Sequence, residues 1–297
     1  MHAISFPDEV ITHGQVLVEP ANLDPRSPLH ELPMRVCEVG RIKDADDLMP
    51  RLIDMATLSA DQQQWMTTAL RSAPHAEEPP ILCAWLESAA DPERLVRGLT
   101  RFLIGPGVED RQVYWRYYDP RVLALTLQLF SDEQTRALLG PVTQWRFPWS
   151  GHWWSVTGPG EEIDVLGGSR PAWPDASQWH SLAHCDVLDK VLRQLPENLA
   201  ACTPPEILLY ARRGDSALLR ARQVLKITDP VELTEYALHC LRYGSAFLDH
   251  PPLHGAWAAL ASGELSWNAL LQRLGPDDYR QMDAVRHLMS PTTGAAR

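Results

Sequence analysis

Apolar and polar positions in the first half of the chain alternate between strand-like and helix-like spacing. Short apolar runs bounded by turn residues predict strands at 34–39, 81–86 and 112–118. Helical spacing lies between them, as in the segment that begins at Asp91-Pro92, where apolar residues recur every three to four positions. Strands and helices that alternate in this way predict an α/β lobe with a small, partly parallel sheet.

Short local motifs predict where several helices begin. Ser59 is followed three positions later by Gln62, and Ser131 by Gln134, the spacing at which both side chains of a capping box bond to the backbone. Residues 122–130 fit a strand, because leucines alternate, and also a helix, because other apolar positions recur at helical spacing. The helix-start signals on both sides of this segment favour the helix.

From residue 175 onward nearly every segment has helical spacing. Residues that favour helix N-termini introduce these segments: Asp175, Thr203 with Glu206, and Asp229 before Pro230. One long helix is predicted at 230–248, followed by shorter ones at 254–261, 264–273 and 276–288. The C-terminal part of the chain is therefore predicted to form an all-α lobe.

These patterns predict five regions along the chain. The segment before the first predicted strand holds five prolines and little periodicity, so it is expected to be irregular. The segment between the two lobes is rich in glycine and proline, which is typical of a linker. The regions are an irregular Pro-rich leader at 1–33, the α/β lobe at 34–157, a linker at 158–174, the helical lobe at 175–290 and a disordered tail at 291–297.

The composition favours a cytoplasmic protein that neither binds nucleic acid nor inserts into a membrane. A formal net charge of -11 and an isoelectric point of about 5.4 disfavour attraction to phosphate backbones and anionic lipid. No stretch approaches the ~20 apolar residues that span a bilayer, and the N-terminus lacks the pattern of a signal peptide. The five cysteines include no C-x-x-C pair, so free thiols in a reducing compartment are expected.

Patterns typical of catalysis or metal binding are few. His180 and His184 stand four positions apart, a spacing that places both imidazoles on one helical face and can bind a transition metal. A metal site needs a third and a fourth ligand. Cys185 points about 100° away from His184 on a helix, and His250 and His254 contribute only if the fold happens to bring them near, so a structural helix face is favoured. No phosphate loop, nucleophile elbow or zinc-protease motif occurs. We therefore expect a protein that is not an enzyme, with no catalytic residue, no metal and no cofactor.

Tryptophans concentrate between the two predicted lobes, where residues 145–179 hold six of the eleven. Two interpretations are open. Large aromatic side chains can seal a core, which is the favoured interpretation for the group, or they can anchor a protein partner. Under the second interpretation, the candidate partner contacts are Trp149, Trp153 and Trp173.

The most distinctive stretch of the chain is Tyr114-Trp-Arg-Tyr-Tyr-Asp-Pro-Arg-Val-Leu123. Asp119 is expected to cap the next helix, and Pro120 suits the first helical position, where its missing N–H costs nothing. Arg116 and Arg121 flank Asp119 and are placed to pair with it. These four residues predict a structural corner between a strand and a helix, fixed by a local ion pair.

This stretch, followed by Gly140-Pro-Val-Thr-Gln-Trp145, resembles the effector-adaptor (effector chaperone) family of bacterial type VI secretion. The resemblance covers residues 34–154, and the later run from Tyr243 to Pro251 is similar to the helical extension that such adaptors carry. It implies a cytoplasmic chaperone without enzymatic activity. The implied partners are the N-terminal region of a type VI effector and the C-terminal region of the spike protein onto which the effector is loaded.

Two other functions stay open from the sequence. One is a hydrolase or metal-dependent enzyme that uses the cleft between the lobes and the face formed by His180 and His184. The other is an immunity-like inhibitor, which would also be acidic and non-catalytic. The family motif is a corner rather than a set of contacts, so the resemblance implies no particular effector-binding residue.

Overall fold

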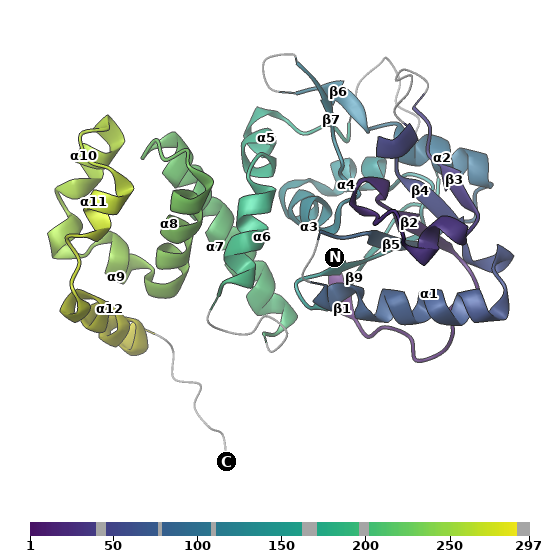
Figure 1. The fold of residues 1–297 in the computed structure, drawn as a ribbon. Coiled ribbons are helices and arrows are strands. Elements are labelled where there is room, and N and C mark those ends of the chain that lie inside the picture. The colour runs from purple at the N-terminus through teal and green to yellow at the C-terminus, as the bar shows by residue number, and fades with distance from the viewer. Residues whose placement is uncertain (40–45, 77–78, 108–110, 162–170, 196–201, 290–297) are drawn as a thin grey trace. The chain divides into compact units, whose positions relative to one another are not determined.

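The computed structural model describes residues 1–39, 46–76, 79–107, 111–161, 171–195 and 202–289 (Figure 1). The chain forms two compact units, Met1–Leu182 and Ala183–Arg297. The N-terminal unit contains a sheet with helices, and the described secondary structure of the C-terminal unit is helical. These units confirm the predicted combination of an α/β lobe with a C-terminal helical lobe.

The N-terminal unit is built on a seven-stranded sheet. Its strands, in spatial order, are β1 (His2–Ile4), β9 (His152–Thr157), β8 (Gln144–Trp149), β5 (Leu82–Glu87), β2 (Gln15–Val18), β4 (Arg51–Asp54) and β3 (Met34–Val36). A separate two-stranded ladder joins β6 (Ile104–Pro106) to β7 (Gln112–Tyr114). Every ladder between described strands is antiparallel.

The expected partly parallel pairing is therefore wrong, and the position of β2 explains why. β4 and β5 flank helix α1 (Ala60–Ser72), an arrangement that usually places two parallel strands side by side. Both strands pair antiparallel with β2, so they run in the same direction but are separated by it. A strand from the N-terminal segment thus replaces one parallel pair by two antiparallel pairs.

The predicted leader at 1–33 is not irregular. It supplies β1 at one edge of the sheet and β2 in the interior, and its prolines begin two short 3-10 turns, Pro20–Asn22 and Pro28–Glu31. The last three residues of β2 are at most 1% exposed. A strand buried on both faces shows no polar alternation, and four residues give too short a signal to stand out among prolines.

Helix α1 covers one face of the sheet (Figure 1). Its Met66 and Leu70 pack with Val16 and Val18 in an apolar cluster whose buried members are at most 9% exposed. Successive residues of a strand point to opposite faces, so Leu17 faces the other side. Full burial of an aliphatic side chain contributes about 1.5–3 kcal/mol. The segment expected to be a leader therefore supplies part of the core.

The remaining helices of the N-terminal unit begin where local motifs predict. They are α2 (Pro92–Thr100), α3 (Pro120–Leu129), α4 (Asp132–Leu139) and α5 (Ala176–Leu182). Ser59 and Ser131 form the predicted capping boxes with Gln62 and Gln134. The ambiguous segment 122–130 is helical up to Leu129, as the helix-start signals favoured.

The C-terminal unit consists of α6 (Cys185–Arg193), α7 (Pro204–Gln223), α8 (Pro230–Tyr243), α9 (Ser245–Leu248), α10 (Ala256–Ser262), α11 (Trp267–Leu271) and α12 (Pro276–Met289). Asp229 caps α8, and Thr203 with Glu206 forms the predicted start of α7. The single helix expected at 230–248 is interrupted at Gly244, whose φ of +57° lies in the left-handed region that favours glycine. No helix in the described part of the chain is both long and apolar enough to cross a bilayer.

The boundary between the two units lies later than the predicted linker at 158–174. Helix α5, which the sequence placed in the helical lobe, belongs to the N-terminal unit. There the side-chain amide of Gln178 donates to the carbonyl of Leu129 at 3.1 Å. Periodicity alone does not show which neighbours a short helix packs against. Residues 162–170 of the linker and the predicted tail at 291–297 lie outside the described residues.

Candidate functional site

The predicted corner is the junction between β7 and α3. The expected strand at 112–118 ends early, at Tyr114, and the chain turns before the helix begins. Asp119 accepts a hydrogen bond from the backbone N–H of Arg121 at 2.9 Å, and Pro120 is the first residue of the helix. This is the N-cap arrangement that the sequence predicts, and it satisfies one of the free amides of the first turn.

Arg121 holds the capping carboxylate from a second direction. Its Nε donates to one carboxylate oxygen of Asp119 at 3.0 Å, and its Nη2 donates to the other at 2.6 Å. A two-pronged contact of this kind is stronger and more directional than a single hydrogen bond. The side chains are only 16% and 3% exposed, so solvent and salt screen the pair weakly. The predicted local ion pair is therefore formed by Arg121.

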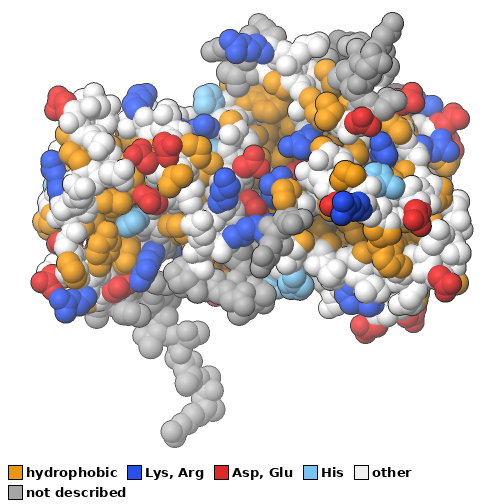
Figure 2. Space-filling view, in the orientation of Figure 1, with side chains coloured by type: hydrophobic (Ala, Val, Ile, Leu, Met, Phe, Trp, Pro, Cys, Tyr) orange, Lys and Arg blue, Asp and Glu red, His pale blue; other side chains and the backbone are white. Residues whose placement is uncertain are grey.

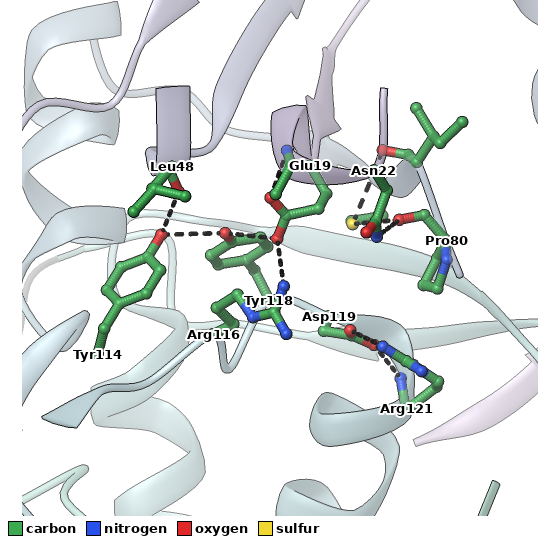
Figure 3. A network of polar contacts seen from close by, with 12 residues as sticks. Glu19, Asn22, Leu48, Pro80, Tyr114, Arg116, Tyr118, Asp119 and Arg121 are labelled. Atoms are coloured by element: carbon green, nitrogen blue, oxygen red, sulfur yellow. Dashed lines mark hydrogen bonds and ion pairs between the residues drawn. The ribbon is translucent and has the colours of Figure 1, made fainter. Parts of the chain in front are cut away.

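Arg116 contacts a different carboxylate. Its Nη1 lies 3.5 Å from Oε2 of Glu19, the residue that directly follows β2 (Figure 3). The pairing suggested for Arg116 and Asp119 is thus replaced by a long-range contact. Glu19 precedes Arg116 by 97 positions, and no local spacing rule can identify a partner at that separation. Glu19 is the residue of this site that sequence reasoning missed.

Glu19 lies at the centre of a buried network. Its side chain is 1% exposed, and its Oε2 accepts from the Tyr118 hydroxyl at 2.9 Å. Its Oε1 accepts from the backbone N–H of Ala21 at 3.1 Å, and its own N–H donates to the carbonyl of Ile81 at 2.9 Å. A carboxylate in the interior needs partners of this kind, because an unpaired buried charge is costly.

Tyr114 and Tyr118 extend this network toward Leu48. Their hydroxyl oxygens are 3.1 Å apart, and the Tyr114 hydroxyl lies 2.8 Å from the carbonyl oxygen of Leu48 (Figure 3). Three contacts link these groups: Tyr114 to Leu48, Tyr114 to Tyr118, and Tyr118 to Glu19. Each hydroxyl carries one proton, so two protons serve the three contacts. Burial raises the pKa of Tyr114 to about 12 and also raises that of Tyr118, so both hydroxyls stay protonated at neutral pH.

The corner therefore gathers two carboxylates and two guanidiniums, each paired with an opposite charge. Burial opposes the charge of Arg116, but the carboxylates of Glu19 and Asp119 outweigh this effect and raise the pKa of Arg116. Because these polar groups hold one another, the arrangement suits a structural task. It fastens the end of β2 to the turn between β7 and α3.

Two of the three tryptophans proposed as partner contacts lie in the core. Trp149 on β8 is 5% exposed, and Trp153 on β9 is 4% exposed. Their rings pack against Trp154 and Phe6, with centroids 5.6 and 4.9 Å apart respectively. Four consecutive residues of β9 are buried, so both faces of this strand are covered. For this pair the structure corrects the partner-contact hypothesis in favour of core packing.

Trp173 is partly exposed, but the N-terminal unit holds it in place. Its indole N–H donates to the carbonyl of Pro106 at 2.5 Å. Its ring contacts those of Trp115 and Trp179, with centroids 5.5 and 5.7 Å apart. Among the three candidates, it alone keeps a solvent-accessible portion that a partner can reach.

The two histidines do not share one helical face. Helix α5 ends at Leu182, and His184 precedes the first residue of α6, so the continuous helix expected here is wrong. His184 is buried and pairs through Nε2 with Asp215 at 2.7 Å. His180 bonds through Nδ1 to the carbonyl of Ala176. Within the described residues, no group of three or more histidines, cysteines or carboxylates is placed to hold a metal ion.

One comparison with known proteins gives a match. Residues 40–137 are similar to a family described as a domain of unknown function, DUF4123. That domain is associated with effector adaptors of type VI secretion. No curated protein and no solved structure matches the chain.

The segment that matches DUF4123 is not self-contained in the fold. It includes the corner and extends into α4, but β2 and the β8–β9 hairpin lie outside it. Glu19 also lies outside, yet it is the partner of Arg116 and Tyr118 within the segment. The network in Figure 3 therefore joins the segment that resembles the family to the chain that precedes it.

Proposed function

We propose that this protein is a non-enzymatic adaptor of type VI secretion. It binds the N-terminal region of an effector in the cytoplasm before export and helps to load that effector onto the C-terminal region of the spike protein. The observation that carries the proposal is the similarity of residues 40–137 to a domain associated with such adaptors. The corner motif at 114–121, which carried the resemblance in the sequence, lies inside the matched segment.

The chemistry of the corner supports a structural role within the adaptor. Its charged side chains are paired with one another, and its two tyrosine hydroxyls serve the same network. Groups held in this way fix the shape of a scaffold. A scaffold of fixed shape loses little conformational freedom when a partner binds, which favours a stable complex.

Co-expression with the effector encoded beside this gene tests the proposal. We expect the two proteins to elute together from a size-exclusion column as a 1:1 complex, and deletion of the adaptor gene to abolish secretion of that effector. An effector from a different secretion cluster serves as the matched control and should elute separately. Separate elution of the cognate pair, with an effector that is equally well expressed and secreted without this chain, would contradict the proposal.

The contact with the spike protein is tested separately. The complex of adaptor and effector is incubated with the C-terminal region of the spike protein and passed over the same column. We expect a ternary complex, because loading requires that the adaptor and its effector reach the spike together. If the spike region elutes alone while the effector complex persists, the adaptor acts on the effector only.

A further inference from the structure

The C-terminal unit contains a groove of about 790 Å³ lined mainly by α7, α8 and α9. Two residues of α7 in its lining, Arg213 and Arg220, are seven positions apart, and so are Tyr236 and Tyr243 of α8. Seven residues make about two helical turns, so each pair lies on one face of its helix and about 10 Å apart along the axis. The lining therefore combines exposed guanidiniums of α7 with buried phenol rings of α8.

The charge of the groove is of one sign. The described residues that line it include four arginines, Arg212, Arg213, Arg220 and Arg242, and no carboxylate. The chain as a whole carries a net charge of -11. On the face of the helical unit seen in Figure 2, acidic and basic side chains are interspersed. A groove with four cations in its lining thus differs from the mixed charges on that face.

These arginines have little internal compensation. Arg242 alone is paired, with Asp283, at a distance of 3.9 Å and with both side chains more than a third exposed. An exposed pair of this length contributes little. Arg212, Arg213 and Arg220 are exposed and form no ion pair with a described carboxylate. Their charges therefore remain available to a ligand.

Tyr236 is a buried member of the groove lining. The residue is fully buried, and its hydroxyl has no nitrogen or oxygen partner among the described residues. Burial, and next the neighbouring Cys240 thiol, raise the pKa of Tyr236, so the hydroxyl keeps its proton at neutral pH. The Cys240 thiol is a side-chain hydrogen-bond partner of this hydroxyl, so Tyr236 belongs to the buried floor of the groove.

We propose that this groove binds an acidic segment of the partner protein, with two carboxylates of that segment on Arg213 and Arg220. The proposal rests on the proposed adaptor function and names the chemistry of the recognised segment. Arginine forms two-pronged bonds with carboxylates, and arginine and tyrosine are enriched among the residues that dominate binding energy at protein interfaces. Charge complementarity selects an acidic occupant.

The spacing of the two arginines makes the proposal more specific. A polyproline II chain has three residues per turn and advances about 3.1 Å per residue, so carboxylates three positions apart lie on one face and about 9 Å apart. The groove therefore fits a peptide with acidic residues about three positions apart.

Charge reversal in the groove tests the proposal in the full-length protein. The variant carries Arg213→Glu and Arg220→Glu, and the matched control is Arg222→Glu, an exposed arginine on the same helix that does not line the groove. Affinity for the effector encoded beside the gene is measured by calorimetry at low and at high salt. We expect the double variant to bind at least about tenfold more weakly and the control to bind within about twofold of wild type.

A second measurement does not depend on the effector. Random peptides displayed on phage are selected against the wild-type protein and then tested on the double variant and on Arg222→Glu. We expect selected peptides with acidic residues about three positions apart, which the control retains and the double variant loses. Unchanged thermal unfolding of each variant shows that the loss does not come from unfolding.

The two measurements separate the groove from the adaptor function. If wild type binds no effector but acidic peptides are still selected and lost in the double variant, the groove proposal stands and the adaptor proposal fails. If the effector binds equally well to wild type and to the double variant, the effector uses another surface and the groove proposal is overturned. Selected peptides without acidic residues, or peptides displaced by micromolar ATP, also overturn it.

Discussion

The corner of the N-terminal unit and the groove of the C-terminal unit both gather arginines, but they use them differently. In the corner, Arg116 and Arg121 each contact a carboxylate that is at most 3% exposed. In the groove, Arg213 and Arg220 are exposed and have no described carboxylate partner. Paired, buried charges hold two parts of a chain in a fixed geometry, whereas unpaired, exposed charges remain free to bind a ligand.

This difference has a consequence for stability. Removing one member of a buried pair leaves an uncompensated charge or donor in the interior, which is strongly destabilising. Removing an exposed charge without a partner has little effect on the free energy of unfolding. Substitutions in the corner should therefore lower stability, whereas substitutions in the groove should weaken binding.

Asp119→Ala is expected to have the largest effect on stability. It removes the N-cap of α3 and leaves the guanidinium of Arg121, 16% exposed, without its partner. We expect a loss of about 3 kcal/mol in the free energy of unfolding, measured by urea denaturation. The control is Asp61→Ala, an exposed acidic residue in the first turn of α1, with an expected change within about 0.5 kcal/mol. Unchanged stability with abolished partner binding would instead place Asp119 at an interface.

Glu19→Ala is expected to have the second-largest effect, a loss of about 2 kcal/mol in the free energy of unfolding. It leaves the Tyr118 hydroxyl without its carboxylate, but Arg116, whose side chain is 41% exposed, can turn toward solvent. Glu19→Gln keeps an acceptor oxygen, so it should reduce the free energy of unfolding less than Glu19→Ala does. The exposed Glu31→Ala is the control, and urea denaturation again gives the measurement. Equal stability of Glu19→Ala and wild type would show that the network does not fasten β2 to the corner.

The features that sequence reasoning predicted are those determined by neighbours along the chain. Capping boxes at Ser59 and Ser131 depend on side chains three positions apart, and the structure contains both. The Asp119 cap and its bond to Arg121 involve residues two positions apart. Such contacts form whenever the helix forms, so a local pattern is sufficient to find them.

The features that sequence reasoning missed depend on contacts between residues that are far apart in the chain. β2 lies between β4 and β5 because of ladders that no periodicity reveals, and this single insertion made the expected parallel pairing wrong. Glu19 reaches Arg116 across 97 positions. The burial of Trp149 and Trp153 depends on the partners of β8 and β9 in the same way. In the groove, Arg213 and Arg220 look like an ordinary solvated face of α7 until α8 is placed beside it.

His239 in α8 provides a test of the helical unit by pH. Burial lowers its pKa below the ordinary 6.5, despite its Nδ1 contact with the carbonyl of Glu235. The unfolded chain therefore binds the proton more tightly, so the contribution of His239 to stability is present above pH 6.5 and is lost as the pH falls through its folded-state pKa. We expect the melting temperature to fall from pH 7.5 to 5.5.

The variant His239→Gln isolates this effect, and the exposed His254→Gln is its control. The fall in melting temperature from pH 7.5 to 5.5 should be smaller in His239→Gln than in wild type, and it should be unchanged in His254→Gln. Asp278 does not contribute to the pH dependence in this range. The N–H of Gly275 and the His250 side chain lower the pKa of Asp278 below the ordinary 3.8, so this carboxylate titrates only in more acidic solutions. An identical slope in all three proteins would contradict the role of His239.

The smallest expected effect on stability is that of Arg213→Ala. The side chain is exposed and forms no ion pair with a described residue, so its removal should change the free energy of unfolding by less than about 0.5 kcal/mol. Arg220 lies about 10 Å away along α7, which is about one Debye length, so its repulsion with Arg213 is largely screened and adds little to this change. Urea denaturation of Arg213→Ala and Asp119→Ala in parallel measures the smallest and the largest expected change in the free energy of unfolding. A loss above about 1 kcal/mol would mean that Arg213 helps to hold the helical unit together, and the contrast between a corner that fixes structure and a groove that binds would no longer hold.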